Sequence, residues 1–125
     1  MTQGTSRRQT GDKEYKVRGD VFALLKSNGT KLVGTIREIS PDGLSFQYIG
    51  EKKPLSKEGE LAICSGNNNL FLYKVPCKIL ADSKLYKHHP SPISMRRCRV
   101  QFGELDGKHA TQIENLIQNL TRDEP

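Results

Sequence analysis

The stretch Gly34–Tyr48 constrains the fold more than any other part of this sequence. Pro41-Asp42-Gly43 is a dense turn signal, because proline pre-sets φ, aspartate bonds to its local backbone and glycine accepts a positive φ. From Leu44 to Tyr48 apolar residues alternate with polar ones. This period of two is typical of a strand with one buried face. The stretch therefore predicts a strand, a tight turn and a second strand.

Polar groups gather at the corner of this predicted hairpin. Glu38, the Ser40 hydroxyl and the Gly43 amide all fall within a few residues of the turn. Such a corner suits a small polar ligand, although a hydroxyl in a turn more often bonds its own backbone. Both interpretations stay open at this point.

The rest of the chain reads as further short strands separated by turn residues. Asn28-Gly29 is a strong hairpin signal, and Pro76 places its strand at a sheet edge or at a bulge. We expect Asp82–Ser94 to be a loop. The expected strands are a buried Val21–Leu25, then Lys31–Ile39, Glu60–Cys64, Leu70–Ala81 and Met95–Phe102. Strands of this length and spacing predict an antiparallel barrel.

The C-terminal part changes to the period of an α-helix, which we expect over about residues 106–120. Its apolar positions are i, i+3, i+4 and i+7, occupied by Ile113, Leu116, Ile117 and Leu120. Asp106 is the expected N-cap. The apolar stripe is expected to cover the open end of the barrel, and docking of a partner is the less favoured alternative.

Basic residues concentrate in the first part of the chain. The 125 residues carry a formal charge of +6. Residues 1–37 hold eight lysines and arginines against three acids, whereas the remainder is nearly balanced. Residues 1–13 lack apolar side chains after Met1 and are expected to form a disordered basic arm. The domain proper is expected over residues 14–122. The basic residues in the first part of the chain either bind an anion or form a merely solvated basic tail.

Several classes of protein are disfavoured by the sequence. No apolar run approaches the length of a membrane span, so no membrane insertion and a cytoplasmic location are expected. The three cysteines are widely spaced, so neither a disulfide framework nor a zinc site is expected. The adjacent His88 and His89 have no further ligands in a recognisable pattern, so we expect neither a metal nor a cofactor. Cys98 and His109 do not form a recognisable catalytic pair, and we predict a non-enzyme.

Ile39-Ser40-x-x-Gly43-Leu44-Ser45-Phe46 resembles the second signature of PilZ domains, (Asp/Asn)-x-Ser-x-x-Gly. Ser40 and Gly43 match, and Glu38 stands where the family prefers Asp or Asn. The segment Met95–Leu105 and the helix after it also resemble the last strand and closing helix of that family. The resemblance implies a mainly β fold, a six-stranded antiparallel barrel of the split-barrel type with a C-terminal helix. It also implies a non-enzymatic signalling domain that binds cyclic di-GMP.

The first signature of that family, Arg-x-x-x-Arg, is absent. No two arginines are four apart, and alignment places Thr10 and Glu14 at the two positions. The residues then expected at the ligand are the substitute cations and the second signature: Arg7, Arg8, Lys16, Arg18, Glu38, Ser40 and Gly43. Because lysine lacks the bidentate fork and Glu14 repels phosphate, we expect weakened affinity.

Three functions remain open from the sequence. The first is a cyclic di-GMP sensor, in which ligand binding orders the basic arm. The second is a ligand-free PilZ-like module that binds an unidentified protein partner in motility or signalling. The third, a basic barrel that binds nucleic acid, fits the pI near 9.3. We disfavour it, because four Tyr and four Phe leave few aromatic side chains for base stacking.

Overall fold

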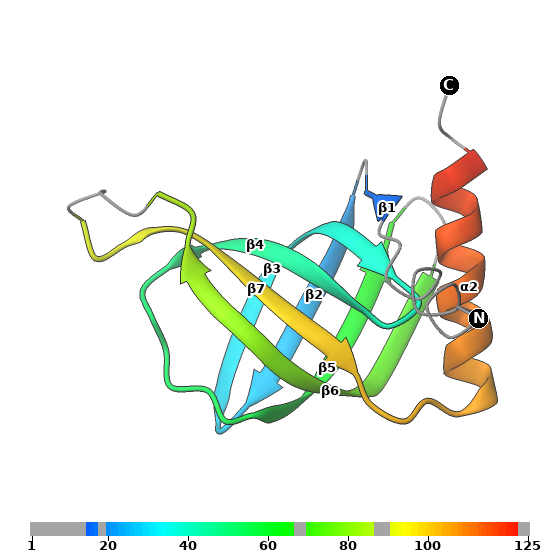
Figure 1. Ribbon diagram of the computed structural model, residues 1–125, viewed down its shortest axis with the longest axis horizontal. Helices are drawn as coiled ribbons and strands as arrows, with labels where there is room; N and C mark the ends of the chain where they lie inside the picture. The colour runs from blue at the N-terminus through cyan, green and yellow to red at the C-terminus, as the bar shows by residue number, and fades with distance from the viewer. Residues whose placement is uncertain (1–14, 18–19, 67–69, 87–90, 123–125) are drawn as a thin grey trace, which may run out of the picture.

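Seven strands and one helix make up the described part of the chain (Figure 1). The computed structural model describes residues 15–17, 20–66, 70–86 and 91–122. The elements are β1 (Tyr15–Lys16), β2 (Val21–Ser27), β3 (Thr30–Ser40), β4 (Gly43–Gly50), β5 (Glu58–Ser65), β6 (Leu70–Lys84), β7 (Ser94–Phe102) and α2 (Gly107–Arg122).

The sheet closes on itself. Its strand order is β1-β3-β2-β5-β6-β7-β4, and β4 also pairs with β3, so that β2 to β7 form a closed six-stranded barrel. All pairings are antiparallel. The short β1 is not one of the six barrel strands and pairs only with the end of β3. The predicted fold, a six-stranded antiparallel barrel with a C-terminal helix, is confirmed.

The barrel interior is filled by the alternating positions that the sequence predicts. On β4 the side chains of Leu44, Phe46 and Tyr48 are all buried, with Phe46 fully enclosed. On β7 the inward residues Cys98 and Val100 lie opposite Phe46 and Leu44. Since directly paired residues share a face, the two strands contribute one continuous wall of the core.

The first hairpin forms as expected, but its strand differs from the prediction. Asn28 and Gly29 both adopt positive φ, 53° and 76°, as a two-residue hairpin turn requires. The prediction of a buried strand over Val21–Leu25 holds for Val21, Ala23 and Leu25 but is wrong at Phe22, which is 41% exposed. An unbroken apolar run does not tell whether the second face of a strand meets protein or solvent.

Strand β6 is longer than predicted. Pro76 lies opposite Glu60 of β5, and the β6–β7 ladder begins only at Cys77, so at Pro76 the strand has a partner strand on one side and the edge alternative is confirmed. The bulge of the β5–β6 ladder precedes Pro76 and lies between Leu72 and Val75. The prediction that Asp82–Ser94 is a loop is wrong at both ends, since β6 continues to Lys84 and β7 already begins at Ser94. There Lys84 pairs with Arg96 of β7, and the hairpin projects beyond the barrel (Figure 1).

Helix α2 stands at one end of the barrel, next to β1 and β6 (Figure 1). Asp106 caps it as expected, because its carboxylate accepts a hydrogen bond of 2.7 Å from the His109 amide. Ile113, Leu116 and Ile117 are buried against the barrel. The stripe is thus used within the domain, and its predicted role at the barrel end is confirmed for these three residues.

The predicted N-terminal arm, residues 1–13, lies outside the described residues and stays a prediction. The proposed boundary at residue 14 is likewise untested. In the part of the chain that the structure describes, no helix is both long and apolar enough to span a membrane.

Candidate functional site

The corner between β3 and β4 is closed by Ser40 itself. Its hydroxyl accepts hydrogen bonds from the amides of Asp42 and Gly43, at 3.1 and 3.2 Å, and donates to the Gly43 carbonyl at 3.4 Å. Ser40 is only 7% exposed. The hydroxyl is therefore hydrogen-bonded to the backbone of its own turn. Of the two interpretations that the sequence allows, this is the structural one and not the ligand contact.

Gly43 is required by the approach of β4 to β7. A Cβ at this position would lie 2.2 Å from the carbonyl oxygen of Val100, far inside van der Waals contact. The Asp42 carbonyl accepts a hydrogen bond of 2.7 Å from the Phe102 amide, which fixes the turn against β7. The two signature residues thus both serve the barrel, and a ligand role for them stays a prediction.

A row of polar and charged residues crosses four strands on the outer wall beside this turn. The register pairs Lys16 of β1 with Glu38 of β3, Glu38 with Ser45 of β4, and Ser45 with Arg99 of β7. The Ser45 hydroxyl donates to the Glu38 carboxylate at 3.4 Å. Because directly opposed residues of antiparallel strands share a face, these four side chains lie on one face of the sheet, where Ser45 is covered by its neighbours and only 4% exposed.

A β-bulge helps to build this surface. The β3–β4 register shifts between Ile36 and Glu38, so that Arg37 is the extra residue. Arg37 is exposed, and Ile36 and Ile39 on either side are fully buried. A bulge redirects neighbouring side chains, and here it leaves Arg37 and Glu38 both accessible beside Ser45.

Strand β7 supplies two arginines that the ligand prediction omitted. Arg97 and Arg99 alternate in the sequence with the buried Cys98 and Val100, which places both on the outward side of this strand. Arg97 lies opposite Gln47, one outward position away from Arg99. Its Nε is buried and has no hydrogen-bond partner among the described residues. We define the outer site as Lys16, Glu38, Ser45, Arg97 and Arg99.

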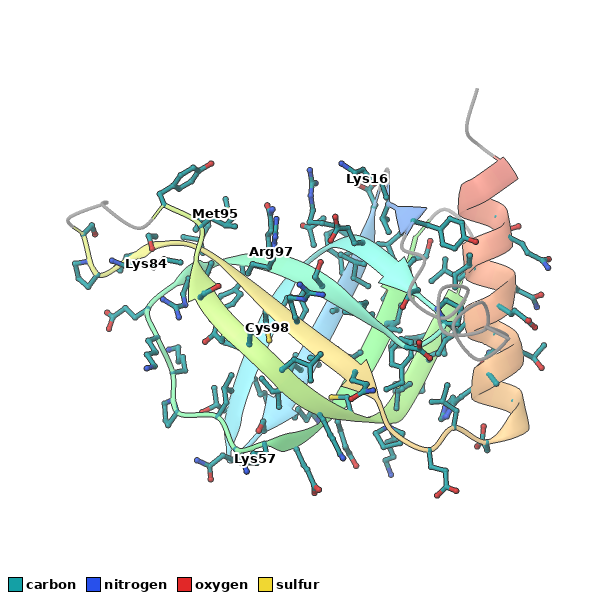
Figure 2. The ribbon with its side chains drawn as sticks, in the orientation of Figure 1. Lys16, Lys57, Lys84, Met95, Arg97 and Cys98 are labelled. Atoms are coloured by element: carbon teal, nitrogen blue, oxygen red, sulfur yellow. The ribbon has the colours of Figure 1, made fainter. Side chains whose placement is uncertain are left out.

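The predicted ligand residues fall into three groups. Lys16 and Glu38 lie in the outer site, and Ser40 and Gly43 lie at the adjoining turn. Arg7, Arg8 and Arg18 lie outside the described residues, as do Thr10 and Glu14. Figure 2 shows Lys16 and Arg97 toward the upper side of the molecule and Lys57 at the opposite, lower side.

A second polar cluster lies inside the barrel. Arg96 Nε donates to the Tyr48 hydroxyl at 3.1 Å and to Asp82 Oδ1 at 3.3 Å, and a terminal nitrogen donates to the Asp82 carbonyl at 3.1 Å. Tyr48 in turn donates to Asp82 Oδ1. Burial, followed by the hydrogen bond to Asp82, raises the pKa of Tyr48 above its usual value. The cluster joins β4, β6 and β7 and has a structural role.

The interior cysteines are poor nucleophiles. Burial raises the pKa of Cys98 to about 12 and that of Cys77 to about 11. The thiolate is the reactive form, so at neutral pH both thiols stay protonated. This argues against the pairing of Cys98 with His109 as catalytic groups. Among the described residues no cluster of three metal-ligating side chains occurs, and His88 and His89 lie outside them.

These raised thiol pKa values predict a loss of stability in alkali. The unfolded chain releases the thiol protons near pH 9.0, whereas the folded chain holds them until about pH 11 at Cys77 and about pH 12 at Cys98. The contribution of each protonated thiol to the free energy of unfolding is complete below pH 9.0. As the pH rises from there to the raised pKa, this contribution is lost at about 1.4 kcal/mol per pH unit for each thiol. Urea unfolding of the reduced protein above pH 9.0 should show a shallower decline for Cys98→Ala. Identical slopes would contradict the raised pKa.

No family model matches this sequence, and no curated protein matches it either. Solved structures do resemble the barrel. The PilZ domain of YcgR from Escherichia coli, solved with c-di-GMP, has a TM-score of 0.69 at 13% identity, over 89% of this chain and 90% of that one. MrkH of K. pneumonia in its apo state has a TM-score of 0.65 at 13% identity, over 89% of this chain and 49% of that one.

A third similar structure is PlzA of Borreliella burgdorferi in complex with c-di-GMP. Its TM-score is 0.61 at 13% identity, over 100% of this chain and 60% of that one. The chain spans nearly all of the isolated YcgR domain but only about half of MrkH. At this identity the likeness shows the fold, and the fold is that of the family suggested by the turn signature.

Proposed function

We propose that this chain, which has the fold of PilZ domains, is a non-enzymatic cytoplasmic signalling domain that binds cyclic di-GMP at the outer site with reduced affinity. The observation that carries the proposal is the row of Lys16, Glu38, Ser45 and Arg99, which the strand register assembles beside the signature turn. It brings cations and a carboxylate onto one face. Similar barrels in YcgR and PlzA have been solved with that ligand.

The arginines of β7 take the place of the missing Arg-x-x-x-Arg pair in this proposal. An arginine binds phosphate oxygens bidentately and also matches the O6/N7 edge of guanine. Arg97 is half-buried and its Nε makes no hydrogen bond among the described residues, so phosphate binding by this guanidinium would break no existing Nε contact. Because Arg97 and Arg99 lie on a strand that is paired on both sides, their backbone is already ordered before binding, which lowers the entropic cost of holding a ligand.

The remaining groups explain why the affinity is expected to be low. Glu38 can accept hydrogen bonds from a guanine, but its carboxylate already accepts one from Ser45. Lys16 contributes a point charge without the planar fork. A ligand must therefore compete for Glu38 and gains less from Lys16 than it would from an arginine.

The test is a titration of ¹⁵N-labelled protein with cyclic di-GMP at fixed salt. We expect amide shifts at Ser45, Arg97 and Arg99, and we expect Arg97→Ala to weaken binding about tenfold or more, because it removes a charge-assisted contact worth about 1.5–3 kcal/mol. Lys57→Ala removes a cation on the opposite side of the molecule and serves as the control (Figure 2). Ser40 and Gly43 are poor test positions, since both are needed for the turn.

Two results would contradict the proposal. Shifts of equal size with GTP would show a general anion surface rather than a site for this ligand. No shifts at millimolar cyclic di-GMP would leave the chain as a ligand-free module that works through a protein partner.

A further inference from the structure

The wall formed by β2, β3, β5 and β6 carries apolar residues on its outer side, and it shares only β3 with the outer site. Phe22 is 41% exposed, Val33 63%, Phe71 48% and Tyr73 58%. A strand that faces water on one side normally carries polar residues there. We call this surface the apolar face, and it consists of Phe22, Leu24, Val33, Ala62, Cys64, Phe71 and Tyr73.

The register arranges the apolar face in two rows. Phe22 lies opposite Cys64, and Cys64 lies opposite Phe71. In the next row Leu24 lies between Val33 and Ala62. Together these residues line a hollow of about 390 Å³. The hollow therefore has room for apolar side chains of a partner.

A strained bulge completes the hollow. The β5–β6 register shifts between Leu61 and Ile63, and within the bulge Lys74 has a φ of 54°, in the left-handed region. This conformation is unfavourable for a residue other than glycine. It leaves Tyr73 and Lys74 both exposed, and the Tyr73 ring packs on Phe71 with a centroid separation of 4.1 Å. Strain of this kind is often found where a surface is shaped for binding.

The remaining parts of this sequence lack the residues to cover the apolar face. The segments outside the described residues contain no Val, Ile, Leu, Phe, Tyr or Trp. At the centre of the hollow strand addition is blocked, because β2 is paired with β3 and β5, and β5 with β2 and β6, whereas the Leu70–Pro76 part of β6 is paired with β5 alone. An occupant at the centre must therefore bind through its side chains, as an amphipathic helix does in a groove.

The charges at one edge of the hollow favour an acidic partner. Lys26 lies opposite Lys31 on β3 and opposite Glu60 on β5, and Lys74 lies at the bulge. Three lysines thus stand against one carboxylate. In a dimer that pairs these edges, the lysines of the two copies would face each other, which is unfavourable. A concave hollow also fits protruding side chains better than it fits a flat lipid surface.

We propose that the apolar face is a docking site for an amphipathic helix of a partner protein whose apolar stripe is flanked by glutamate or aspartate. The stripe fills the hollow between Phe22 and Tyr73, and the carboxylates lie beside Lys26 and Lys74. Such an interface would be strengthened by apolar burial and by charge complementarity at its rim.

The test uses a fluorescein-labelled helical peptide of about 18 residues, with leucines on one face and glutamates beside them. A matched peptide carries lysine in place of glutamate. We expect the acidic peptide to bind wild-type protein about tenfold or more tightly than the basic one. Val33→Glu should weaken binding of the acidic peptide by a similar factor, whereas Ile49→Glu should not, because Ile49 is also exposed but lies on β4 outside the apolar face.

Cys64 provides a second readout within the apolar face. It is exposed, whereas Cys77 and Cys98 are buried, so a thiol reagent should modify Cys64 first. Bound acidic peptide should slow that modification in wild-type protein and not in Val33→Glu. This protection reports the location of binding and not only its strength.

Other outcomes would overturn the proposal. Equal binding of the two peptides, or no binding, would exclude an acidic helix. A wild-type dimer in sedimentation that Val33→Glu dissociates would assign the face to a second copy. Binding to phosphatidylglycerol vesicles that Val33→Glu abolishes would assign it to a membrane surface. Circular dichroism of both variants should match the wild type, since the two side chains are exposed.

Discussion

Replacing Phe46 with alanine is expected to lower the free energy of unfolding by about 3–5 kcal/mol, as for other large-to-small substitutions in close-packed cores. The Phe46 side chain is fully buried in the barrel, opposite Ile36 on β3 and Cys98 on β7. It also contacts Tyr48, with ring centroids 6.0 Å apart. The strands on both sides are fixed by closure of the barrel, so the cavity cannot collapse. Urea denaturation followed by circular dichroism measures the change.

Phe71→Ala is the matched control for this experiment. It makes the same chemical change at a side chain that is 48% exposed on β6. We expect it to lower the free energy of unfolding by much less than Phe46→Ala, because less apolar area returns to water. If the two substitutions destabilised the protein equally, the assignment of inner and outer faces would be wrong.

The second large effect is expected at the buried cluster of Tyr48, Asp82 and Arg96. Arg96→Met should lower the free energy of unfolding by about 3–5 kcal/mol, since removal of one partner leaves an uncompensated charge in the interior. The Arg96 and Asp82 side chains are only 6% and 10% exposed. Asp82 Oδ2 already lacks a hydrogen-bond partner among the described residues, so loss of Arg96 leaves the carboxylate poorly satisfied.

A double-mutant cycle separates the charge from the packing. We expect Arg96→Met combined with Asp82→Leu to be more stable than Arg96→Met alone, because the orphaned carboxylate is then absent. Equilibrium unfolding of the four proteins gives the interaction energy. Additive effects would mean that Arg96 and Asp82 do not depend on one another, which would contradict the geometry of the cluster.

The barrel presents two walls of different character. The outer site on β1, β3, β4 and β7 is polar and cationic, and the apolar face lies on β2, β3, β5 and β6. Strand β3 belongs to both, with Val33 in the apolar face and Glu38 in the outer site. A ligand on one wall and a protein on the other could therefore occupy the domain together without competing for the same residues.

Local features were readable from the sequence because they depend on residues close in the chain. The alternation from Leu44 to Tyr48, the Asn28-Gly29 hairpin and the Asp106 cap each follow from steric or hydrogen-bonding preferences within a few residues. The same holds for the helical stripe at Ile113, Leu116 and Ile117. These features sufficed to predict a β-barrel with a closing helix.

The tertiary structure alone decided what depends on register between distant strands. Asp82 reads as the start of a loop, yet pairing of β6 with β7 extends the strand and buries it beside Arg96. Lys16 and Arg99 are far apart in the chain and join one row only because β3 and β4 lie between them. Phe22 was predicted to be buried and is exposed, because hydrophobicity indicates a strand but not which face the closed barrel turns inward.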